Sequence, residues 1–158
     1  MIDVSATGAT VTIKAPAIGS VTVSRFSDEG TPFEFNEIEV TGSALSLNGE
    51  LITWSKPVAY AASVTVIPHS DEDNALRKLL EASHVRFTGK GTKAVSPENV
   101  KTSLTLKCPK INAGGNSFKM YSYTNGRIVS GPTAPSTSPE GKLSARTYTF
   151  VFEQMAES

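Results

Sequence analysis

A long strand followed directly by a helix constrains the fold of this chain more than any other feature. The segment Pro57–Ile67 alternates in the manner of a strand, with Tyr60, Ala62, Val64 and Val66 on one face. The opposite face carries only small residues, which allow another layer of the protein to come close: Ala59, Ala61, Ser63 and Thr65. Since a helix follows at once along the chain, we expect that helix to cover the sheet.

The helix is predicted over residues 70–83, after a break at Pro68-His69. Ser70 stands at the N-cap position, and Asp73 three residues later completes a short capping box. The first turn is acidic, which the helix dipole favours. One narrow apolar stripe then recurs at helical spacing, formed by Leu76, Leu79, Leu80 and Ser83.

Most of the remaining chain reads as antiparallel strands. In Phe33–Val40 strict alternation would split the apolar residues between two faces, so we predict a bulge near Asn36–Glu37 that turns all of them inward. Val100–Pro109 alternates cleanly and places Cys108 on its apolar face. We further predict a strand at Ser117–Tyr123, a turn at Asn125-Gly126 with a return at Arg127–Ser130, and a last strand at Ala145–Glu153. The predicted fold class is mainly β: an antiparallel β-sandwich or partly closed barrel with one flanking helix.

An extended β-hairpin is predicted at about residues 42–54. Asn48-Gly49 favours a two-residue type I′ turn, because both residues tolerate positive φ. The two arms carry too many apolar side chains for a free, solvated hairpin: Leu45, Leu47, Leu51, Ile52 and Trp54. Two interpretations remain open, since the hairpin either folds back on its own sheet or lies on another copy of the protein.

Length and charge narrow the class of protein. We expect the 158 residues to form a single domain, 1–158, with flexible ends at about 1–9 and 154–158. Lysine plus arginine equals aspartate plus glutamate at 15 each, so no overall charge points to nucleic acid or to an anionic membrane. No apolar run approaches the ~20 residues of a membrane span, and no signal peptide is apparent. A single cysteine fits a reducing compartment.

No motif predicts catalysis, a cofactor or a metal. Gly89-Lys90-Gly91-Thr92 lacks the first glycine and the Ser or Thr of a phosphate loop, because these positions hold His84 and Gly91. His69, Asp71 and Asp73 could coordinate a metal, but helix capping accounts for the two aspartates. Cys108 is expected to be a core residue rather than a nucleophile. We therefore expect that the protein is not an enzyme.

The order of these elements resembles the inner tail tube proteins of contractile-tailed bacteriophages, relatives of the needle-tube proteins of type VI secretion. The resemblance spans Val11–Glu153 and rests on chain size and element order. It is carried by Phe33–Val40, the Asn48-Gly49 hairpin, the strand Ala59–Ile67 and the helix from Ser70, whose start Asp71–Leu80 is similar to that of several such families.

The resemblance implies a structural virion protein whose subunits form hexameric rings, stacked into a tube through which phage DNA passes without sequence-specific binding. Glu34 and Glu39 would then line an acidic lumen, although a solvated strand face explains them equally well. The implied subunit interface is the hairpin, with Leu45, Leu47, Asn48, Gly49, Leu51 and Trp54. Implied partners are further copies of the chain and the tail sheath, tape measure, baseplate and tail terminator proteins. The implied location is the virion tail, assembled in the cytoplasm of the host bacterium.

Two alternatives remain beside a tube subunit. A baseplate or tube-end component of the same fold would bind the tube without polymerising indefinitely. A stand-alone β-sandwich binding module, such as an adhesin, would instead need an exposed aromatic platform, for which Trp54, Tyr121 and Tyr123 are the available residues.

Overall fold

The protein is mainly β and is built on one antiparallel sheet of seven strands. The computed structural model describes residues 8–25, 31–88, 91–93, 95–112, 115–134, 136–137 and 139–158. The sheet has the strand order β2-β1-β9-β10-β11-β6-β3, and the two edge strands β2 and β3 do not pair with each other, so it does not close into a barrel. Its strands are β1 (Thr10–Ala15), β2 (Gly19–Val23), β3 (Phe33–Phe35), β6 (Tyr60–Val66), β9 (Thr102–Asn112), β10 (Gly115–Ser130) and β11 (Arg146–Glu157).

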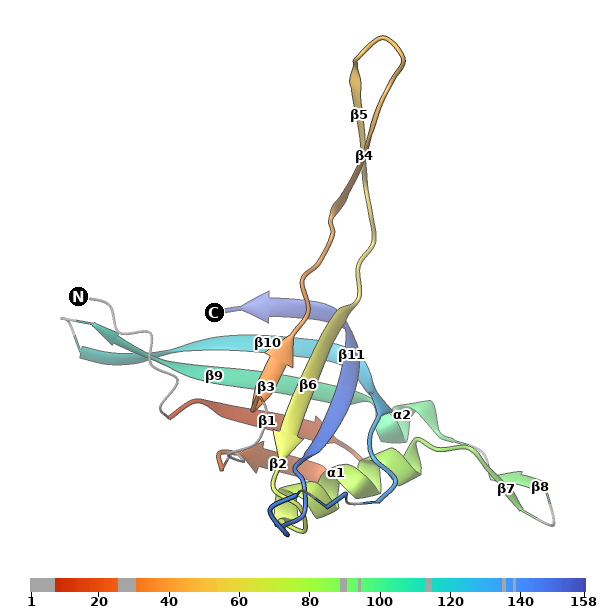
Figure 1. Ribbon diagram of the computed structural model, residues 1–158, viewed down its shortest axis with the longest axis vertical. Helices are drawn as coiled ribbons and strands as arrows, with labels where there is room; N and C mark the ends of the chain where they lie inside the picture. The colour runs from red at the N-terminus through yellow and green to blue at the C-terminus, as the bar shows by residue number, and fades with distance from the viewer. Residues whose placement is uncertain are drawn as a thin grey trace.

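The sheet folds over on itself at β11. In Figure 1, β11 curves, so that its first half runs beside β6 and its last part runs along β10. As a result β6 and β3 cross over β9 and β10, and the core fills the space between these two layers. Tyr148, Phe150 and Phe152 alternate along β11 and are all buried, so they share the face of the strand that points to the core. The core is contributed chiefly by Val11, Ile13, Val23, Ala62, Val64, Leu104, Leu106, Ile128, Tyr148, Phe150 and Phe152.

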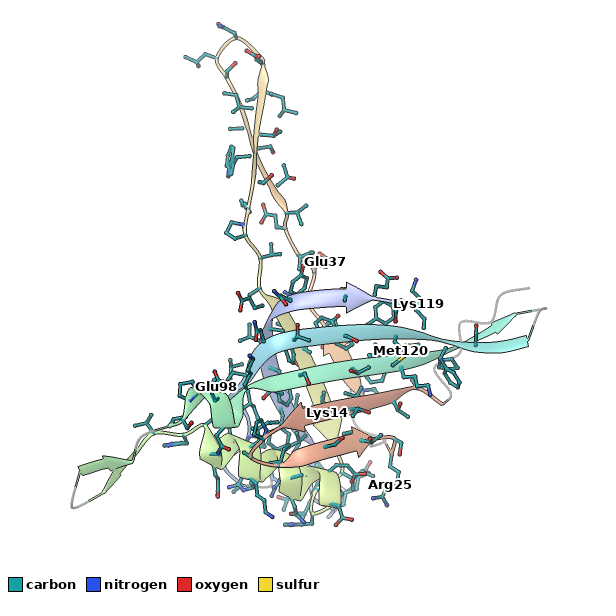
Figure 2. All side chains as sticks on the ribbon, turned by 180° about the vertical axis from the view of Figure 1, so that it is seen from behind. Lys14, Arg25, Glu37, Glu98, Lys119 and Met120 are labelled. Atoms are coloured by element: carbon teal, nitrogen blue, oxygen red, sulfur yellow. The ribbon has the colours of Figure 1, made fainter. Side chains whose placement is uncertain are left out.

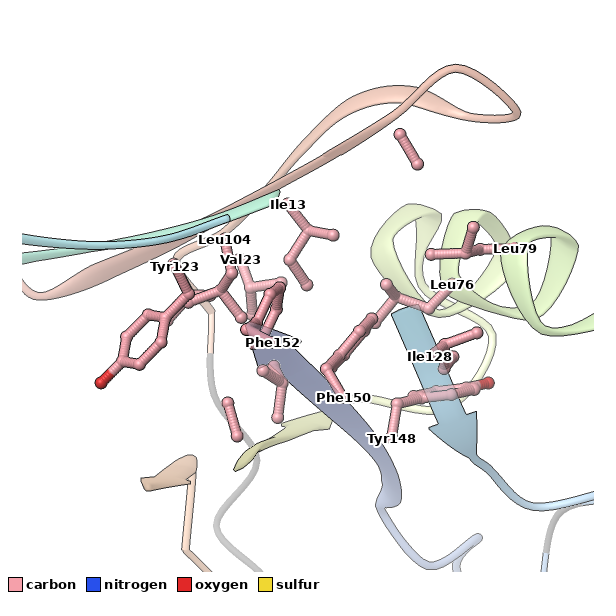
Figure 3. Packing of buried hydrophobic residues seen from close by; sticks show 14 of the residues in the cluster. Ile13, Val23, Leu76, Leu79, Leu104, Tyr123, Ile128, Tyr148, Phe150 and Phe152 are labelled. Atoms are coloured by element: carbon pink, nitrogen blue, oxygen red, sulfur yellow. The ribbon is translucent and has the colours of Figure 1, made fainter. Parts of the chain in front are cut away.

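One helix covers an open side of this core. It is α1 (Asp71–Ala82), capped by Ser70, whose hydroxyl accepts a hydrogen bond from the backbone of Asp73 as the sequence predicts. Leu76 and Leu79 are fully buried. Figure 3 shows both side chains directed toward Ile128 and the aromatic residues of β11. A second, single-turn helix that the sequence analysis did not identify, α2 (Pro97–Val100), leads into β9.

Two hairpins stand apart from the main sheet. β4 (Thr41–Leu45) and β5 (Leu51–Ser55) pair only with each other and project far from the body, at the top of Figure 1. β7 (Arg86–Thr88) and β8 (Gly91–Lys93) form a shorter hairpin beyond the end of α1. The extended hairpin predicted at residues 42–54 is therefore present, and it does not fold back on its own sheet.

The prediction of one inward-facing strand over Phe33–Val40 is wrong. β3 ends at Phe35, and Ile38 and Val40 are 42% and 54% exposed. Asn36 accounts for the difference, because its backbone N–H and its side-chain oxygen hydrogen-bond Ala61 of β6, and its side-chain nitrogen donates to the carbonyl of Ala59, just before β6. This anchor ends the strand and sends the chain outward into the projecting hairpin.

A second correction concerns Asn125-Gly126, which is not a turn. β10 runs unbroken from Gly115 to Ser130, and the two residues lie in a β-bulge where the pairing with β9 shifts. Asn125 has φ of 55°, so the residue does adopt the left-handed conformation that a turn would use. Because β9 and β11 pair with β10 on both sides, they hold the chain in the sheet through this kink.

The C-terminal residues are also more ordered than predicted. β11 continues to Glu157, and its last residues pair with β10 between Tyr121 and Thr124. Ser158 exchanges two backbone hydrogen bonds with Met120, at 2.9 and 3.1 Å. The expected flexible tail at 154–158 is thus part of the sheet, whereas most of the expected N-terminal arm lies outside the described residues.

Candidate assembly surface

The β4–β5 hairpin has one wholly apolar face. Residues directly opposite each other in an antiparallel pair share a face, and the register pairs Gly42 with Trp54 and Ala44 with Ile52. The other face is polar near the base and apolar only at its end, where Leu45 lies opposite Leu51. Gly42 is buried in spite of its exposed surroundings, because the indole of Trp54 lies across it where a side chain would otherwise stand.

Leu47 forms the tip of this hairpin. The loop has three residues, Leu47–Gly49, and is closed by a hydrogen bond of 2.9 Å from the Gly49 N–H to the Ser46 carbonyl. Of the loop residues only Gly49 has positive φ, so the type I′ turn predicted at Asn48-Gly49 is wrong. The extra residue places the Leu47 side chain at the outermost point, where it is fully exposed.

The large apolar side chains of the hairpin are exposed to solvent within a single copy of the chain. Exposure is 71% for Leu45, 63% for Leu51, 52% for Ile52 and 49% for Trp54. An isolated two-stranded hairpin is only marginally stable in water. Contiguous apolar surface of this kind marks a site of interaction with another protein or a membrane. Here it extends along both arms and ends in the tip.

The two glutamates predicted to line a lumen do not lie together. Glu34 is exposed on the edge strand β3, opposite Ser63 of β6. Glu39 lies at the base of the hairpin and forms an ion pair of 2.9 Å with Lys56. Lys56 therefore offsets the negative charge of Glu39. The assignment of Glu34 or Glu39 to an acidic lumen stays a prediction.

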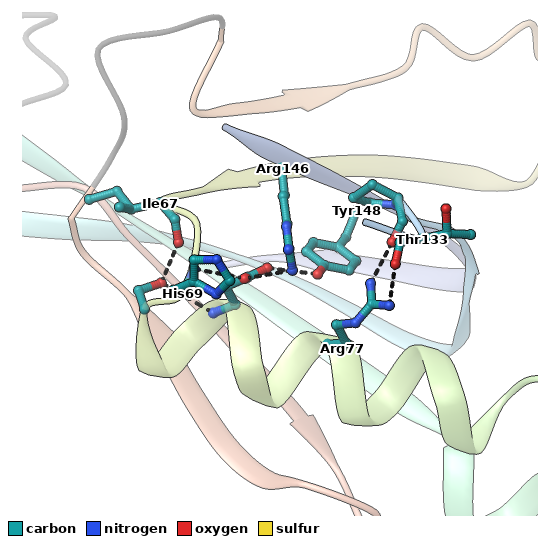
Figure 4. Close-up of polar contacts among 9 residues, drawn as sticks. Ile67, His69, Arg77, Thr133, Arg146 and Tyr148 are labelled. Atoms are coloured by element: carbon teal, nitrogen blue, oxygen red, sulfur yellow. Dashed lines mark hydrogen bonds and ion pairs between the residues drawn. The ribbon is translucent and has the colours of Figure 1, made fainter. Parts of the chain in front are cut away.

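A buried polar cluster fixes α1 to the start of β11, and the sequence analysis did not find it. Figure 4 shows Arg146 and Tyr148 converging on the first turn of the helix. The Asp73 carboxylate accepts hydrogen bonds from Arg146 Nη1 at 2.9 Å, Tyr148 Oη at 2.7 Å and the backbone N–H of His69 at 3.0 Å. Burial, and then the hydrogen bond to Asp73, raise the pKa of Tyr148 to about 12. Asp73 therefore does more than cap the helix, which is the only role that the sequence predicts for it: it also pairs with Arg146 and Tyr148 of β11.

Two further arginines hold the helix in place. Arg77 donates hydrogen bonds to the carbonyls of Pro132 and Thr133, in the loop before β11. Arg127 of β10 donates a hydrogen bond of 3.0 Å to the carbonyl of Ser83, the C-cap residue of α1. These contacts, together with the cluster at Asp73, hold α1 against β10, the start of β11 and the loop before it.

One model of a known protein family matches nearly the whole chain. A family model described as tail fiber protein gp32 matches residues 2–156. The chain belongs to the tail fiber protein gp32 family. It is therefore a phage-tail-related protein. A comparison with curated proteins finds no match.

Solved structures similar to this gp32-family chain include a tube terminating cap and a sheath/tube terminator. The tube terminating cap of the anti-feeding prophage aligns with TM-score 0.50 and 13% identity, over 94% of this chain and 87% of that chain. The sheath/tube terminator of an extracellular contractile injection system, PVC, in the extended state aligns with TM-score 0.49 and 12% identity, over 94% and 92%. At 13% identity the likeness to the prophage cap shows a shared fold.

Further observations on the described residues of the gp32-family chain concern an aromatic side chain, the cysteine, metal-ligating groups and helix length. Tyr123 is buried against Phe35 and Phe152, so it offers no exposed aromatic platform for a binding module. Cys108 packs against the core as predicted, and burial raises the pKa of its thiol, which disfavours the nucleophilic thiolate. Among the residues described, three metal-ligating side chains do not gather anywhere. Nor is any described helix long and apolar enough to cross a membrane.

Proposed function

We propose that this protein is a structural, non-enzymatic tail subunit that assembles with copies of itself into a ring at the end of the tail tube of a contractile phage-like particle. The observation that carries the proposal is the projecting β4–β5 hairpin, whose apolar side chains at Leu45, Leu47, Leu51, Ile52 and Trp54 are exposed in the described structure. A neighbouring copy that covers this surface would remove it from water. Burying a leucine side chain stabilises an association by about 1.5–3 kcal/mol.

The open sheet supports the same kind of contact. β2 and β3 are the two edge strands of the sheet, and edge strands readily pair with another chain. Head-to-tail contacts between identical subunits generate closed rings when the rotation between neighbours closes. A projecting hairpin and two edge strands on one subunit are the features that a ring of this kind would use.

A position at the tube end is preferred over the tube body for two reasons. The chain belongs to a family described as a tail fiber protein, and it shares its fold with a tube terminating cap. In this position its neighbours would be the tube and the sheath. The six-fold symmetry, the passage of DNA through a lumen, and contacts with tape measure and baseplate proteins are predictions from the resemblance to tube proteins, and stacking into a long tube is the second candidate.

The experiment is the assembly state of a tip variant. Leu47→Asp should prevent assembly and leave a folded monomer, because it places a charge where the proposed interface buries an apolar side chain. Asn74→Asp is the matched control, since it adds the same charge to an exposed residue of α1, outside the hairpin. Light scattering and negative-stain electron microscopy would measure assembly, and circular dichroism would confirm that both variants fold.

The images also separate the two candidates. Single or paired rings support a tube-end component, whereas long tubes of purified protein indicate the tube body. If Leu47→Asp assembled as the wild type does, the hairpin tip would not be the subunit interface and the proposal would lose its main support.

A further inference from the structure

A cavity of about 800 Å³, lined by both apolar and polar residues, lies on the side of the sheet that faces away from the core. It is positioned by the β1–β2 turn, the start of β9 and the bulge in β10. Lys14, one of its lining residues, is labelled on this side of the sheet in Figure 2. The polar side chains that line it are Lys14, Ser20, Lys101, Ser103, Thr124, Asn125 and Gln154.

These side chains form a row across neighbouring strands. Lys14 lies directly opposite Ser20 on β2 and Ser103 on β9. Neighbouring strands are about 4.8 Å apart, so the two hydroxyl groups flank the lysine closely. Beyond Ser103 the row continues into β10 and β11, where the Thr124 hydroxyl donates a hydrogen bond of 3.3 Å to the Gln154 side-chain oxygen.

The bulge of β10 shapes the cavity wall. Asn125 adopts φ of 55°, a conformation that an asparagine tolerates but that few residues favour. Bulges commonly redirect side chains beside functional sites, and non-glycine residues in this conformation gather at such sites. Here the bulge brings Thr124 and Asn125 to the cavity beside the two lysines.

The cavity has an unbalanced positive charge. Lys14 and Lys101 form no ion pair with any described residue, and no carboxylate lines the cavity. This arrangement stands out in a chain whose positive and negative charges balance at 15 each. An adjacent cavity of about 700 Å³ shares Lys101 and Asn125, and its lining includes the carboxylates Glu98 and Glu153.

We propose that this cavity binds a phosphate group. Two ammonium groups supply the charge, while the hydroxyls and amides on either side can donate hydrogen bonds to oxygens that point in several directions. Lysine binds phosphate as a point charge, whereas planar carboxylates are more often held by the fork of an arginine, and the cavity has no arginine. The group is either free phosphate or a phosphate of a nucleic-acid backbone.

The test compares two ligands on the full-length chain and three variants. Inorganic phosphate would be titrated calorimetrically at constant ionic strength, and a single-stranded oligodeoxynucleotide would be titrated by fluorescence anisotropy. Lys14→Gln and Lys101→Gln should each weaken phosphate binding about tenfold, the loss expected for one hydrogen bond to a charged group. Lys78→Gln removes the same charge from the exposed side of α1 and should bind as the wild type does.

Each outcome decides the proposal. Saturable binding of inorganic phosphate that depends on both lysines supports a site for free phosphate. Oligonucleotide binding with the same dependence supports the nucleic-acid source. The proposal is overturned if neither ligand binds, or if Lys78→Gln weakens binding as much as the cavity variants. The site does not depend on the proposed ring, because its residues lie away from the hairpin and the Leu47→Asp monomer should retain it.

Discussion

The buried cluster at Asp73 allows a stability prediction whose size can be worked out from the structure. Asp73 is completely buried, and the Arg146 side chain beside it is 6% exposed. Asp73→Asn keeps the shape of the side chain but leaves the guanidinium as an uncompensated buried charge. Breaking a buried pair in this way costs about 3–5 kcal/mol. The loss is a large share of the ~5–15 kcal/mol that stabilises a typical domain.

The hydrogen bonds indicate that the charge accounts for most of this cost. The carboxylate accepts three hydrogen bonds, two at one oxygen and one from Tyr148 at the other. An asparagine can keep its oxygen toward Arg146 and His69, while the Tyr148 hydroxyl rotates to accept a hydrogen bond from the new amide. What cannot be recovered is the negative charge opposite the guanidinium.

The assay is urea unfolding followed by circular dichroism, at a concentration where the protein is monomeric. Asp71→Asn is the matched control, because Asp71 is exposed in the same turn and should cost no more than about 1 kcal/mol. Adding Arg146→Met to Asp73→Asn should recover part of the loss, since it removes the uncompensated charge. A destabilisation by Asp73→Asn no greater than that of Asp71→Asn would refute the view that the pair is desolvated.

Two further predictions concern the ionisation of Tyr148 and the fluorescence of Trp54. The folded-state pKa of Tyr148 is about 12, above the ~10 of an unfolded tyrosine, so stability is full below pH 10 and falls as pH rises toward 12. Tyr148→Phe should make this fall shallower in urea unfolding measured across that range, and an unchanged slope would contradict the raised pKa. Gly42→Val should displace the only tryptophan, Trp54, and shift its fluorescence to the red with little change in unfolding free energy. Thr41→Val, which pairs with Ser55 on the other face, is the control and should leave the spectrum unchanged.

Features encoded locally were predictable from the sequence. The helix could be placed because its cap at Ser70 and its leucine stripe lie within one short segment. The hairpin could be placed because Asn48-Gly49 favours chain reversal and lies between two short arms that follow each other along the chain. The turn type was missed, since the choice between a two-residue and a three-residue loop depends on how the arms pair.

Features that depend on distant partners were not predictable. Asn125-Gly126 has the same composition as a hairpin turn, and only the presence of β9 and β11 on both sides keeps it within a strand. Asp73 fits helix capping equally well, and its partner Arg146 lies 73 positions further along the chain. The phosphate-site candidate depends in the same way on strand register, which brings Lys14 beside Ser103.

Asn36 connects the fold to the proposed assembly. Its side-chain oxygen accepts a hydrogen bond of 2.9 Å from the Ala61 N–H, and its side-chain nitrogen donates one of 3.2 Å to the Ala59 carbonyl. A further bond of 2.9 Å, from the Lys56 N–H to the Val40 carbonyl, holds the two arms together where they leave the body. Ordering a flexible segment on binding lowers affinity, so a hairpin already fixed at its base loses less entropy when a neighbour covers it. Asn36 therefore both ends β3 and fixes the base of the hairpin, which would lower the entropic cost of the proposed contact with a neighbouring copy.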